Sequence, residues 1–397
     1  MRSRVRSAVV VVCAVLGAAT ASAQVVQVGK DMSLTFKGFI SATVFAQDQN
    51  FAFGNGQNAA WPIPPESTVD RWFGGGDVRN TRLTMAFDGP KVTGDWKLGA
   101  TLEMDFFGGF NGTGAFSGQQ PTPRLRLAFA DFGNGRTTIR VGQQWSPLFG
   151  NVPVSLSHIA FPLGYGSAGD IGWRFPGIFL YQKLTPKDSP VAIDTVAAIM
   201  SGSWSGPNSN VDFGTAGNAS WPQFELRFNF GGKAGPGTWN AYVVGHIDEK
   251  DLSGAGASTS NDKLTGSAVE IGAKFQFGPV LIQGNGYSGH SIGQQFAAIT
   301  QFGKIQSEGG WAQLGFDFTK NWSLFAFWGI DNPKDSDALA ALANAARLRN
   351  IMYAGMLRWK TGPFAIGFEY MHSTLTAGTA KVETEGRQLA LSALYSF

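Results

Sequence analysis

The chain has 397 residues, of which 43% are hydrophobic, and it contains 53 glycines and 32 phenylalanines. Beyond the amino-terminal segment, no apolar run reaches the roughly 18 residues of a helical membrane span, and no Lys/Arg-rich run indicates nucleic acid as a partner. The 31 basic residues exceed the 28 acidic ones only by the three arginines of that segment, so the rest of the chain is formally neutral.

Residues 1–23 have the features of a secretory signal peptide. A basic start is followed by an apolar run from Ala8 to Ala19 and by a small-x-small motif that ends at Ala23. We expect cleavage there, export of the chain and a mature protein that begins at Gln24. Cys13 is the only cysteine and would be lost with the signal, so we expect neither disulfides nor thiolate metal ligands.

The rest of the chain alternates apolar and polar residues, which is typical of strands with one lipid-facing and one water-facing side. From Asp95 to Phe107, for example, apolar residues alternate with Glu103 and Asp105. The last such segment ends on the aromatic residue Phe397. Sixteen strands are predicted, in chain order Leu34–Phe45, Arg79–Phe87, Asp95–Phe107, Arg124–Phe132, Arg136–Trp145, Ile171–Gln182, Ala192–Met200, Gln223–Phe230, Trp239–Asp248, Val269–Phe277, Val280–Gly289, Trp311–Phe318, Trp322–Ile330, Arg349–Trp359, Phe364–Met371 and Gln388–Phe397.

The connections between these strands alternate between tight turns and long segments. Gly133 to Gly135 and Gly278-Pro279 are tight, whereas Phe45 to Arg79 is long. Lipid offers a backbone no hydrogen bonds, so a sheet in a membrane must close on itself. We therefore predict one domain over residues 24–397, an all-β, 16-stranded antiparallel transmembrane barrel in the bacterial outer membrane, with short periplasmic turns and long extracellular loops, surrounded by lipid and lipopolysaccharide.

The alternation also predicts which side chains line the lumen. If Leu127 and Phe129 face lipid, Arg126 points inward, and if Phe175 and Phe179 face lipid, Arg174 does too. The same reasoning gives a basic wall of six arginines: Arg82, Arg124, Arg126, Arg136, Arg140 and Arg174. Such a wall favours anions, and guanidinium groups suit carboxylates. The alternative is that the arginines pair with inward acids, of which the candidates are Glu103, Asp105 and Glu225.

The segment 146–170 is the third long connection and is unusually apolar for a loop. Apolar residues are costly in water, so we expect this segment to fold into the barrel as a constriction loop. Asp170 is its only acid, so it would leave an arginine wall largely unneutralised. The residues expected to line the constriction are Phe149, His158, Phe161, Tyr165 and Asp170.

Three local motifs resemble the DcaP-like outer-membrane porins of Gram-negative bacteria. They are Glu103 to Phe107, Leu125 to Gly133 and Val141 to Ser146. The resemblance implies a homotrimer of sixteen-stranded barrels that favours small anionic solutes, often dicarboxylic or aromatic acids. Some members carry an amino-terminal coiled coil, for which residues 24–33 leave no room.

Two other classes of function are compatible with an outer-membrane barrel. An outer-membrane lipid hydrolase needs a serine and a histidine, but His158, His246, His290 and His372 are scattered and no Gly-x-Ser-x-Gly elbow is present. No cofactor or metal is predicted, because the Gly-x-Gly-x-x-Gly match at residues 284–289 precedes no helix and no ligand spacing occurs. An adhesin or purely structural barrel stays open. Passive diffusion through a porin is the function that the sequence favours.

Overall fold

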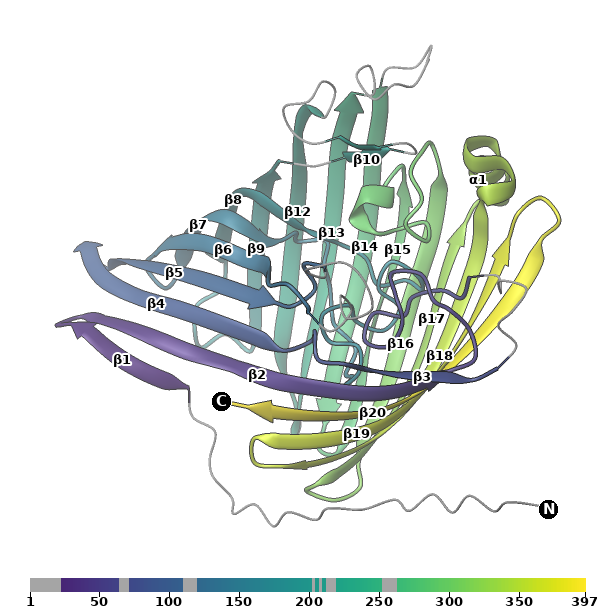
Figure 1. Cartoon of the computed structure of the whole chain (residues 1–397). Helices are drawn as coiled ribbons and strands as arrows, with labels where there is room; N and C mark the ends of the chain where they lie inside the picture. The colour runs from purple at the N-terminus through teal and green to yellow at the C-terminus, as the bar shows by residue number, and fades with distance from the viewer. Residues whose placement is uncertain are drawn as a thin grey trace, which may run out of the picture.

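The computed structural model describes residues 23–63, 71–109, 120–201, 204–206, 209–211, 219–251 and 263–397. The predicted signal peptide, residues 1–23, lies outside this part except for Ala23. The described chain forms a closed antiparallel barrel of sixteen strands, as predicted (Figure 1). The barrel strands are β2 (Met32–Gln47), β4 (Arg82–Thr93), β5 (Trp96–Asp105), β6 (Arg124–Gly133), β7 (Thr137–Trp145), β8 (Arg174–Lys183), β9 (Val191–Met200), β12 (Ala219–Ala234), β13 (Gly237–Asp251), β14 (Lys263–Phe277), β15 (Val280–His290), β16 (Gln306–Asp317), β17 (Trp322–Pro333), β18 (Arg347–Thr361), β19 (Phe364–Ala377) and β20 (Val382–Ser396).

The first and last barrel strands close the sheet. β2 pairs with β20 from Phe39 opposite Ser396 to Gln47 opposite Gln388. Beyond this ladder, Gly38 and Phe397 exchange two backbone hydrogen bonds of 3.0 Å. The rest of this edge of β2, from Met32 to Phe36, pairs with a short strand, β1 (Gln24–Gly29), which the sequence did not predict. A closed ladder leaves few backbone groups to be satisfied by lipid, as a membrane barrel requires.

The opposite edge of β2 is shared by two strands. β4 pairs with its first half and β3 (Phe73–Asp77) with its second half. The residues between β3 and β4, 78–81, belong to neither ladder, and Asn80 among them is fully buried. Other short elements are β10 (Trp204–Gly206), β11 (Ser209–Val211), α1 (Asp335–Leu342) and two 3₁₀ turns, η2 (Gly293–Gln295) and η3 (Ala343–Ala345). None of the helices in the described ranges is long and apolar enough to cross a membrane.

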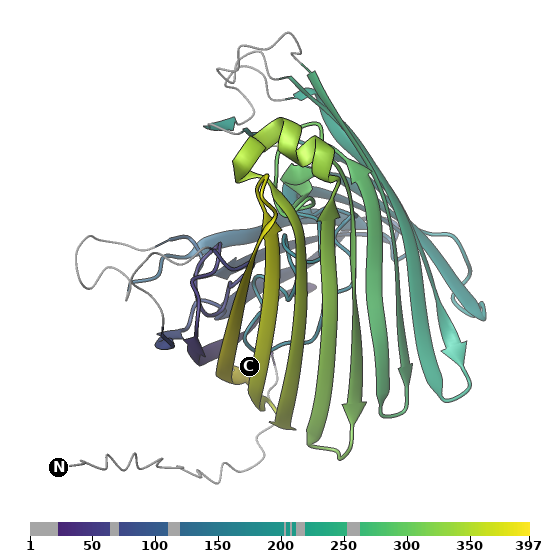
Figure 2. The same ribbon diagram turned by 90° about the vertical axis from the view of Figure 1, so that its right-hand side faces the viewer.

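The two rims of the barrel differ as predicted (Figure 2). Turns of a few residues join the strands at one rim, and at Gly278 and Gly362 these turns use positive φ angles of 53° and 52°, which glycine adopts without cost. The other rim carries longer connections and α1. Its last connection, residues 378–381, has only four residues and is shorter than expected.

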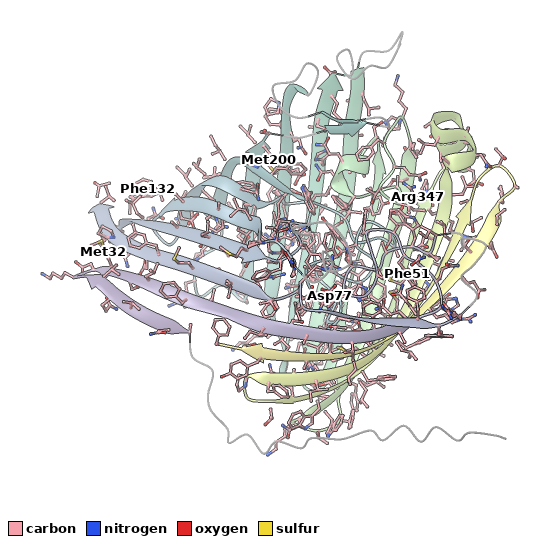
Figure 3. All side chains as sticks on the ribbon, in the orientation of Figure 1. Met32, Phe51, Asp77, Phe132, Met200 and Arg347 are labelled. Atoms are coloured by element: carbon pink, nitrogen blue, oxygen red, sulfur yellow. The ribbon has the colours of Figure 1, made fainter. Side chains whose placement is uncertain are left out.

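Along β14 the two faces of the barrel wall separate cleanly. Val269 and Ile271 are 54% and 61% exposed on the outer face, whereas Glu270 between them is buried inside. Outer positions meet hydrocarbon in a membrane, so the apolar side chains there need no protein partner. Figure 3 shows Asp77 near the middle of the molecule, Arg347 on its right-hand side and Phe132 on its left-hand side.

Strand β6 departs from the predicted faces. The register between β5 and β6 shifts, because Glu103 pairs with Leu127 and the next residue, Met104, pairs with Leu125. Directly opposed residues share a face, so this bulge turns Leu127 and then Phe129 inward. The prediction that Leu127 and Phe129 face lipid is wrong.

From Phe175 onward, strand β8 also has its faces reversed relative to the prediction. Arg174 at its start still lies inside, because its guanidinium and that of Arg126 both lie over the Trp145 ring. Phe175 and Phe179 are buried inside the barrel, where they pack against Ala198 and Met200 of β9. The lipid-facing residues are Ile178 and Leu180 instead. Both faces of β8 are apolar, so the alternation alone could not orient it.

Candidate functional site

Four charged residues on β5 and β6 form the centre of the inner wall. Asp105 accepts hydrogen bonds from Nε and Nη2 of Arg124, at 3.0 and 2.7 Å, and from Nη1 of Arg126 at 2.8 Å. Glu103 accepts another from Nε of Arg126 at 2.8 Å. The structure places these predicted arginines inward, and it also shows the pairing with inward acids that was the alternative.

Two further arginines join this cluster without an acid of their own. Arg82 Nε is 3.8 Å from Glu103, and its Nε and Nη2 have no hydrogen-bond partner in the described part of the chain. Arg174 is 4% exposed, and its Nε and Nη1 likewise lack a partner among the described residues. The Arg174 guanidinium lies over the rings of Trp145, at 4.9 Å, and Trp173, at 4.4 Å.

The basic cluster, defined as Arg82, Arg124, Arg126 and Arg174, therefore contains four guanidinium groups. Among the described residues, Arg82, Arg124 and Arg126 pair with two carboxylates, those of Glu103 and Asp105, and Arg174 forms no ion pair. Its members come from β4, β6 and the start of β8, and a surplus of positive charge stays at the wall. Buried or partly buried charges are screened by salt less than exposed ones. The cluster therefore carries more guanidinium groups than carboxylates.

The other two predicted arginines stand apart from the basic cluster. Arg140 is paired with Asp131 through bonds of 2.7 and 2.9 Å and lies over the Phe129 ring at 3.6 Å. Arg136 precedes β7 and is exposed at a short turn, where its Nε lies 3.4 Å from the carbonyl oxygen of Lys183. The inclusion of Arg136 in the inner wall is therefore corrected, because it belongs to the rim of short turns.

The third long loop, L3 (residues 146–173), lies inside the barrel. Its first half follows the inner wall from strand to strand through four hydrogen bonds: Leu148 N to Glu225 Oε2 at 2.7 Å, Asn151 Nδ2 to Ala273 O at 3.0 Å, Val154 N to Gln313 Oε1 at 2.7 Å and Ser155 Oγ to Glu369 Oε1 at 2.9 Å. Glu225, predicted to line the pore, thus anchors L3 and also accepts from His246 at 2.8 Å.

Arg227 of β12 fixes the start of L3, a role that the sequence did not reveal. Its Nη1 donates to the carbonyl oxygens of Pro147 and Phe149, at 3.0 and 3.1 Å. The guanidinium also lies 3.7 Å from the Tyr242 ring centroid. Bonds from a charged donor are about twice as strong as neutral ones, so this arginine holds the backbone of the loop rather than facing solutes.

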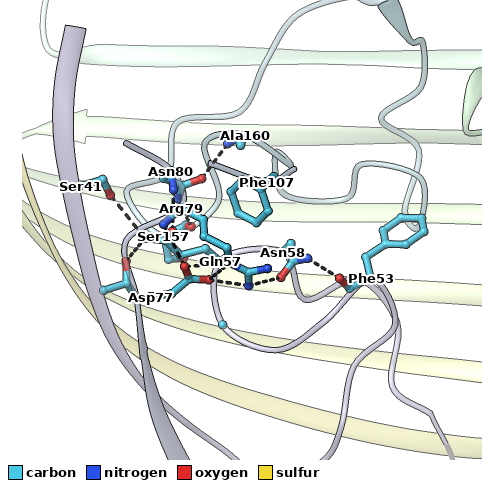
Figure 4. Close-up of polar contacts among 12 residues, drawn as sticks. Ser41, Phe53, Gln57, Asn58, Asp77, Arg79, Asn80, Phe107, Ser157 and Ala160 are labelled. Atoms are coloured by element: carbon cyan, nitrogen blue, oxygen red, sulfur yellow. Dashed lines mark hydrogen bonds and ion pairs between the residues drawn. The ribbon is translucent and has the colours of Figure 1, made fainter. Parts of the chain in front are cut away.

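The residues between β3 and β4 connect L3 to the first long loop, L1 (residues 48–72) (Figure 4). The Asn80 side chain donates to the Ser157 carbonyl oxygen at 2.6 Å and accepts from Ala160 N at 2.9 Å. Its backbone N–H donates to Gln57 Oε1 of L1 at 2.8 Å. Arg79 pairs with Asp77 at 2.7 Å beside this junction. The two loops are thus joined through the wall.

Aromatic side chains of L3 lie close together beside the basic cluster. Tyr165 is buried, and its ring lies 5.9 Å from that of Phe149 and 6.1 Å from that of Phe161. Arg124 lies over the Phe161 ring at 5.0 Å, so the aromatic group and the basic cluster meet there. Phe53 of L1 joins at 6.1 Å from Phe161, a contact that the sequence did not predict.

The two remaining loop residues singled out from the sequence are buried. Asp170 is fully enclosed in L3, and burial, together with the nearby Glu270, raises the pKa of its carboxyl well above the ordinary value. Burial disfavours the charged form of this carboxyl. His158 lies beside the Ser157 hydroxyl, at 2.7 Å, and Glu369, at 3.5 Å.

Two observations on the described residues concern catalysis and metal binding. Ser157, His158 and Glu369 come together as a hydrolase triad might, but all three are at most 3% exposed, which leaves no access for a lipid. In the residues that the structure describes, no group of three or more His, Cys, Asp or Glu side chains is arranged to hold a metal ion.

The close approach of L3 to β16 predicts a mutational effect. A Cβ at Gly169, where φ is +87°, would lie 2.3 Å from Gly310 N, so Gly169→Ala forces the loop off the wall. Overpacking of this kind costs about 1–3 kcal/mol. We expect a lower unfolding temperature, measured by heat-modified electrophoretic mobility. Gly245→Ala, whose Cβ meets nothing within 4 Å, is the control and should leave the temperature unchanged; equal losses would contradict the packing argument.

Comparison with known proteins was made on sequence and on structure. No protein-family model and no curated protein matches the chain. The outer membrane channel DcaP of Acinetobacter baumannii matches with a TM-score of 0.70 and 18% identity, over 92% of this chain and 97% of that one. The chain has the fold of the outer-membrane porins.

Two further porin-fold structures agree. The anion-selective porin from Comamonas acidovorans has a TM-score of 0.58 and 13% identity, over 92% of this chain and all of its own. OmpT of Vibrio cholerae, an outer-membrane protein, has a TM-score of 0.55 and 12% identity, over 94% of this chain and all of its own. The predicted resemblance to DcaP-like porins is thus confirmed at the level of the fold.

Proposed function

We propose that the chain is a passive diffusion channel of the outer membrane that favours small anions, in particular carboxylates attached to an apolar or aromatic body. The observation that carries the proposal is the basic cluster: in the described part of the chain its four arginines have two paired carboxylates, Glu103 and Asp105. A wall with excess positive charge raises the local concentration of anions and lowers that of cations. Guanidinium groups present planar donors that match carboxylates.

The aromatic group beside the cluster supports the second half of the proposal. Phe161 and Phe107 both lie within 5.5 Å of the Arg124 guanidinium, so a solute held by its carboxylate has apolar surface next to it. Removing apolar area from water contributes about 25 cal/mol per Å². A solute with a ring is therefore favoured over a bare inorganic anion.

The surroundings of the channel are proposed from the shared fold. An anion-selective porin is among the structures that match, and OmpT of Vibrio cholerae is described in a trimer form. We propose that this chain is exported through cleavage after Ala23 and assembles as a homotrimer among lipid and lipopolysaccharide. No enzymatic step is proposed, since the Ser157, His158 and Glu369 side chains are enclosed.

The proposal is tested with purified protein in a planar bilayer under a KCl gradient. We expect stable conductance and a reversal potential of the sign set by chloride, because the fixed charge of the wall is positive. The preference should weaken at high salt, where the Debye length falls to about 3 Å. Absence of conductance contradicts the channel, and a reversal potential of the opposite sign contradicts the anion preference.

A further inference from the structure

The sixth long loop, L6 (residues 291–305), also enters the barrel, although nothing in the sequence predicts it. Residues 291–295 and 297–299 are buried, and Phe296 is only partly exposed. L6 joins β15 to β16 and contains the turn η2 (Gly293–Gln295). It therefore forms part of the interior of the barrel.

Ala298, Ile299 and Thr300 form a left-handed turn in L6. Their φ angles are 56°, 51° and 54°, and Phe296 two residues earlier has a φ of 63°. The left-handed region costs an L-residue roughly 1–2 kcal/mol, and it is rarest for β-branched residues such as Ile299 and Thr300. Three such residues in succession persist only where the surroundings determine the backbone.

Every backbone group of the turn has a partner, and Asp331 of β17 is central among these. Asp331 is fully buried; one carboxylate oxygen accepts from Ile299 N at 3.0 Å and the other from the Tyr287 hydroxyl at 2.7 Å. The remaining partners are Tyr287 Oη for Ala298 N at 3.2 Å, Gln301 Nε2 for Ala298 O at 2.8 Å, Arg347 Nε for Ile299 O at 3.0 Å, Arg347 Nη2 for Thr300 O at 3.2 Å and Ala297 O for Thr300 N at 3.0 Å.

L6 also contacts the second half of L3, residues 165–173. The Phe296 ring stacks on Trp173 at 4.6 Å and on Tyr165 at 4.8 Å. Gly172 N donates to Gln295 O at 2.6 Å, and Thr300 Oγ1 donates to Gly166 O at 2.9 Å. L3 is thus held from inside the barrel by L6 as well as by the wall.

We propose that L6 is a fixed support for the constriction, and that Asp331 is a positioning residue that, through the left-handed turn, sets where Phe296 holds L3. The proposal rests on the channel function proposed above. Without the carboxylate the turn relaxes toward ordinary right-handed or extended backbone, and the residues around Phe296 move with it. L3, which already lies inside the barrel, then loses one of its supports and moves away from the wall more often, which narrows the lumen. Asp331 touches no solute and acts only through the loops.

The test is single-channel recording of the full protein with Asp331→Ala. A hydrogen bond to a charged acceptor contributes about 1.5–3 kcal/mol, and 1.4 kcal/mol is a factor of ten in an equilibrium constant. We expect the closed or reduced-conductance fraction of time to rise about tenfold, with Asp331→Asn, which keeps one acceptor, in between. Asp317→Ala is the control, because it removes a carboxylate from neighbouring β16 near the opposite rim. Its closed fraction should equal that of the unaltered protein.

Comparing glycine with alanine at position 299 separates the effect of backbone strain from that of losing the side chain. Glycine adopts positive φ freely, whereas alanine does not, and both remove the buried Ile299 side chain. In the Asp331→Ala background we expect Ile299→Gly to lower the closed fraction and Ile299→Ala to leave it high. If Asp331→Ala does not insert, Tyr287→Phe, which removes a partner of both Asp331 and Ala298, gives the same comparison.

Two results would overturn the proposal: closures in the Asp331→Ala or Tyr287→Phe channel that match those of the unaltered protein, or equal effects of glycine and alanine at position 299. Both are read against the conductance of the unaltered protein. Absence of that conductance would instead remove the proposed function itself.

Discussion

Replacing Asp105 with asparagine should raise the anion preference of the channel and at the same time destabilise the barrel. The Asp105 side chain is fully buried and accepts three hydrogen bonds from Arg124 and Arg126. Asparagine keeps the shape and removes the charge, so Arg124 loses its carboxylate and Arg126 keeps only that of Glu103. Breaking one side of a buried ion pair costs about 3–5 kcal/mol.

Two measurements separate the parts of this prediction. Denaturant unfolding in detergent should show the loss of stability, and the reversal potential under a KCl gradient should move further toward that of chloride. Asp131→Asn is the control, because its ion pair with Arg140 is partly exposed and such pairs contribute at most about 1 kcal/mol. Equal stability losses in the two variants, or a shift of the Asp105 variant toward cations, would contradict the account of the basic cluster.

The strand count could be predicted from the sequence because each barrel strand separates lipid from a polar interior. In β14 the exposed Val269 and Ile271 alternate with the buried Glu270, and the pattern is visible without a structure. The same rule failed in β8, where Phe175 and Phe179 pack inside against Met200. An apolar patch on the inner wall removes the contrast on which the rule depends.

The sequence predicts the parts of the candidate site that depend on a single strand, but not the contacts between strands. Inward arginines follow from alternation, but the pairing of Arg126 with both Glu103 and Asp105 depends on the register of β5 with β6 and on a bulge between them. The left-handed turn at Ile299 contains no glycine, so the sequence carries no turn signal there. Its conformation is imposed by contacts from distant strands, such as that of Asp331.

The largest change in selectivity should come from removing the two arginines that have no acid of their own, with Arg82→Gln and Arg174→Gln combined. At an effective dielectric constant of about 20, a unit charge about 10 Å from an ion contributes about 1.7 kcal/mol, and salt of 0.1 M screens this to about 0.6 kcal/mol. A positive charge stabilises an anion and destabilises a cation by similar energies, so each arginine contributes twice this energy to the anion-to-cation permeability ratio. The anion-to-cation permeability ratio should fall at least about tenfold.

A matched control comes from an arginine of the same wall that is already neutralised. Arg140 is bonded to Asp131, so Arg140→Gln leaves an inward carboxylate and should shift the ratio less than the double variant does, because only one charge changes. Exposed Arg136, at the rim of short turns, should shift it least. The expected order is the double variant, then Arg140→Gln, then Arg136→Gln. If the net charge of the chain set selectivity, Arg140→Gln and Arg136→Gln would shift the logarithm of the ratio equally, each by half as much as the double variant; that result would contradict a role for the position of the basic cluster.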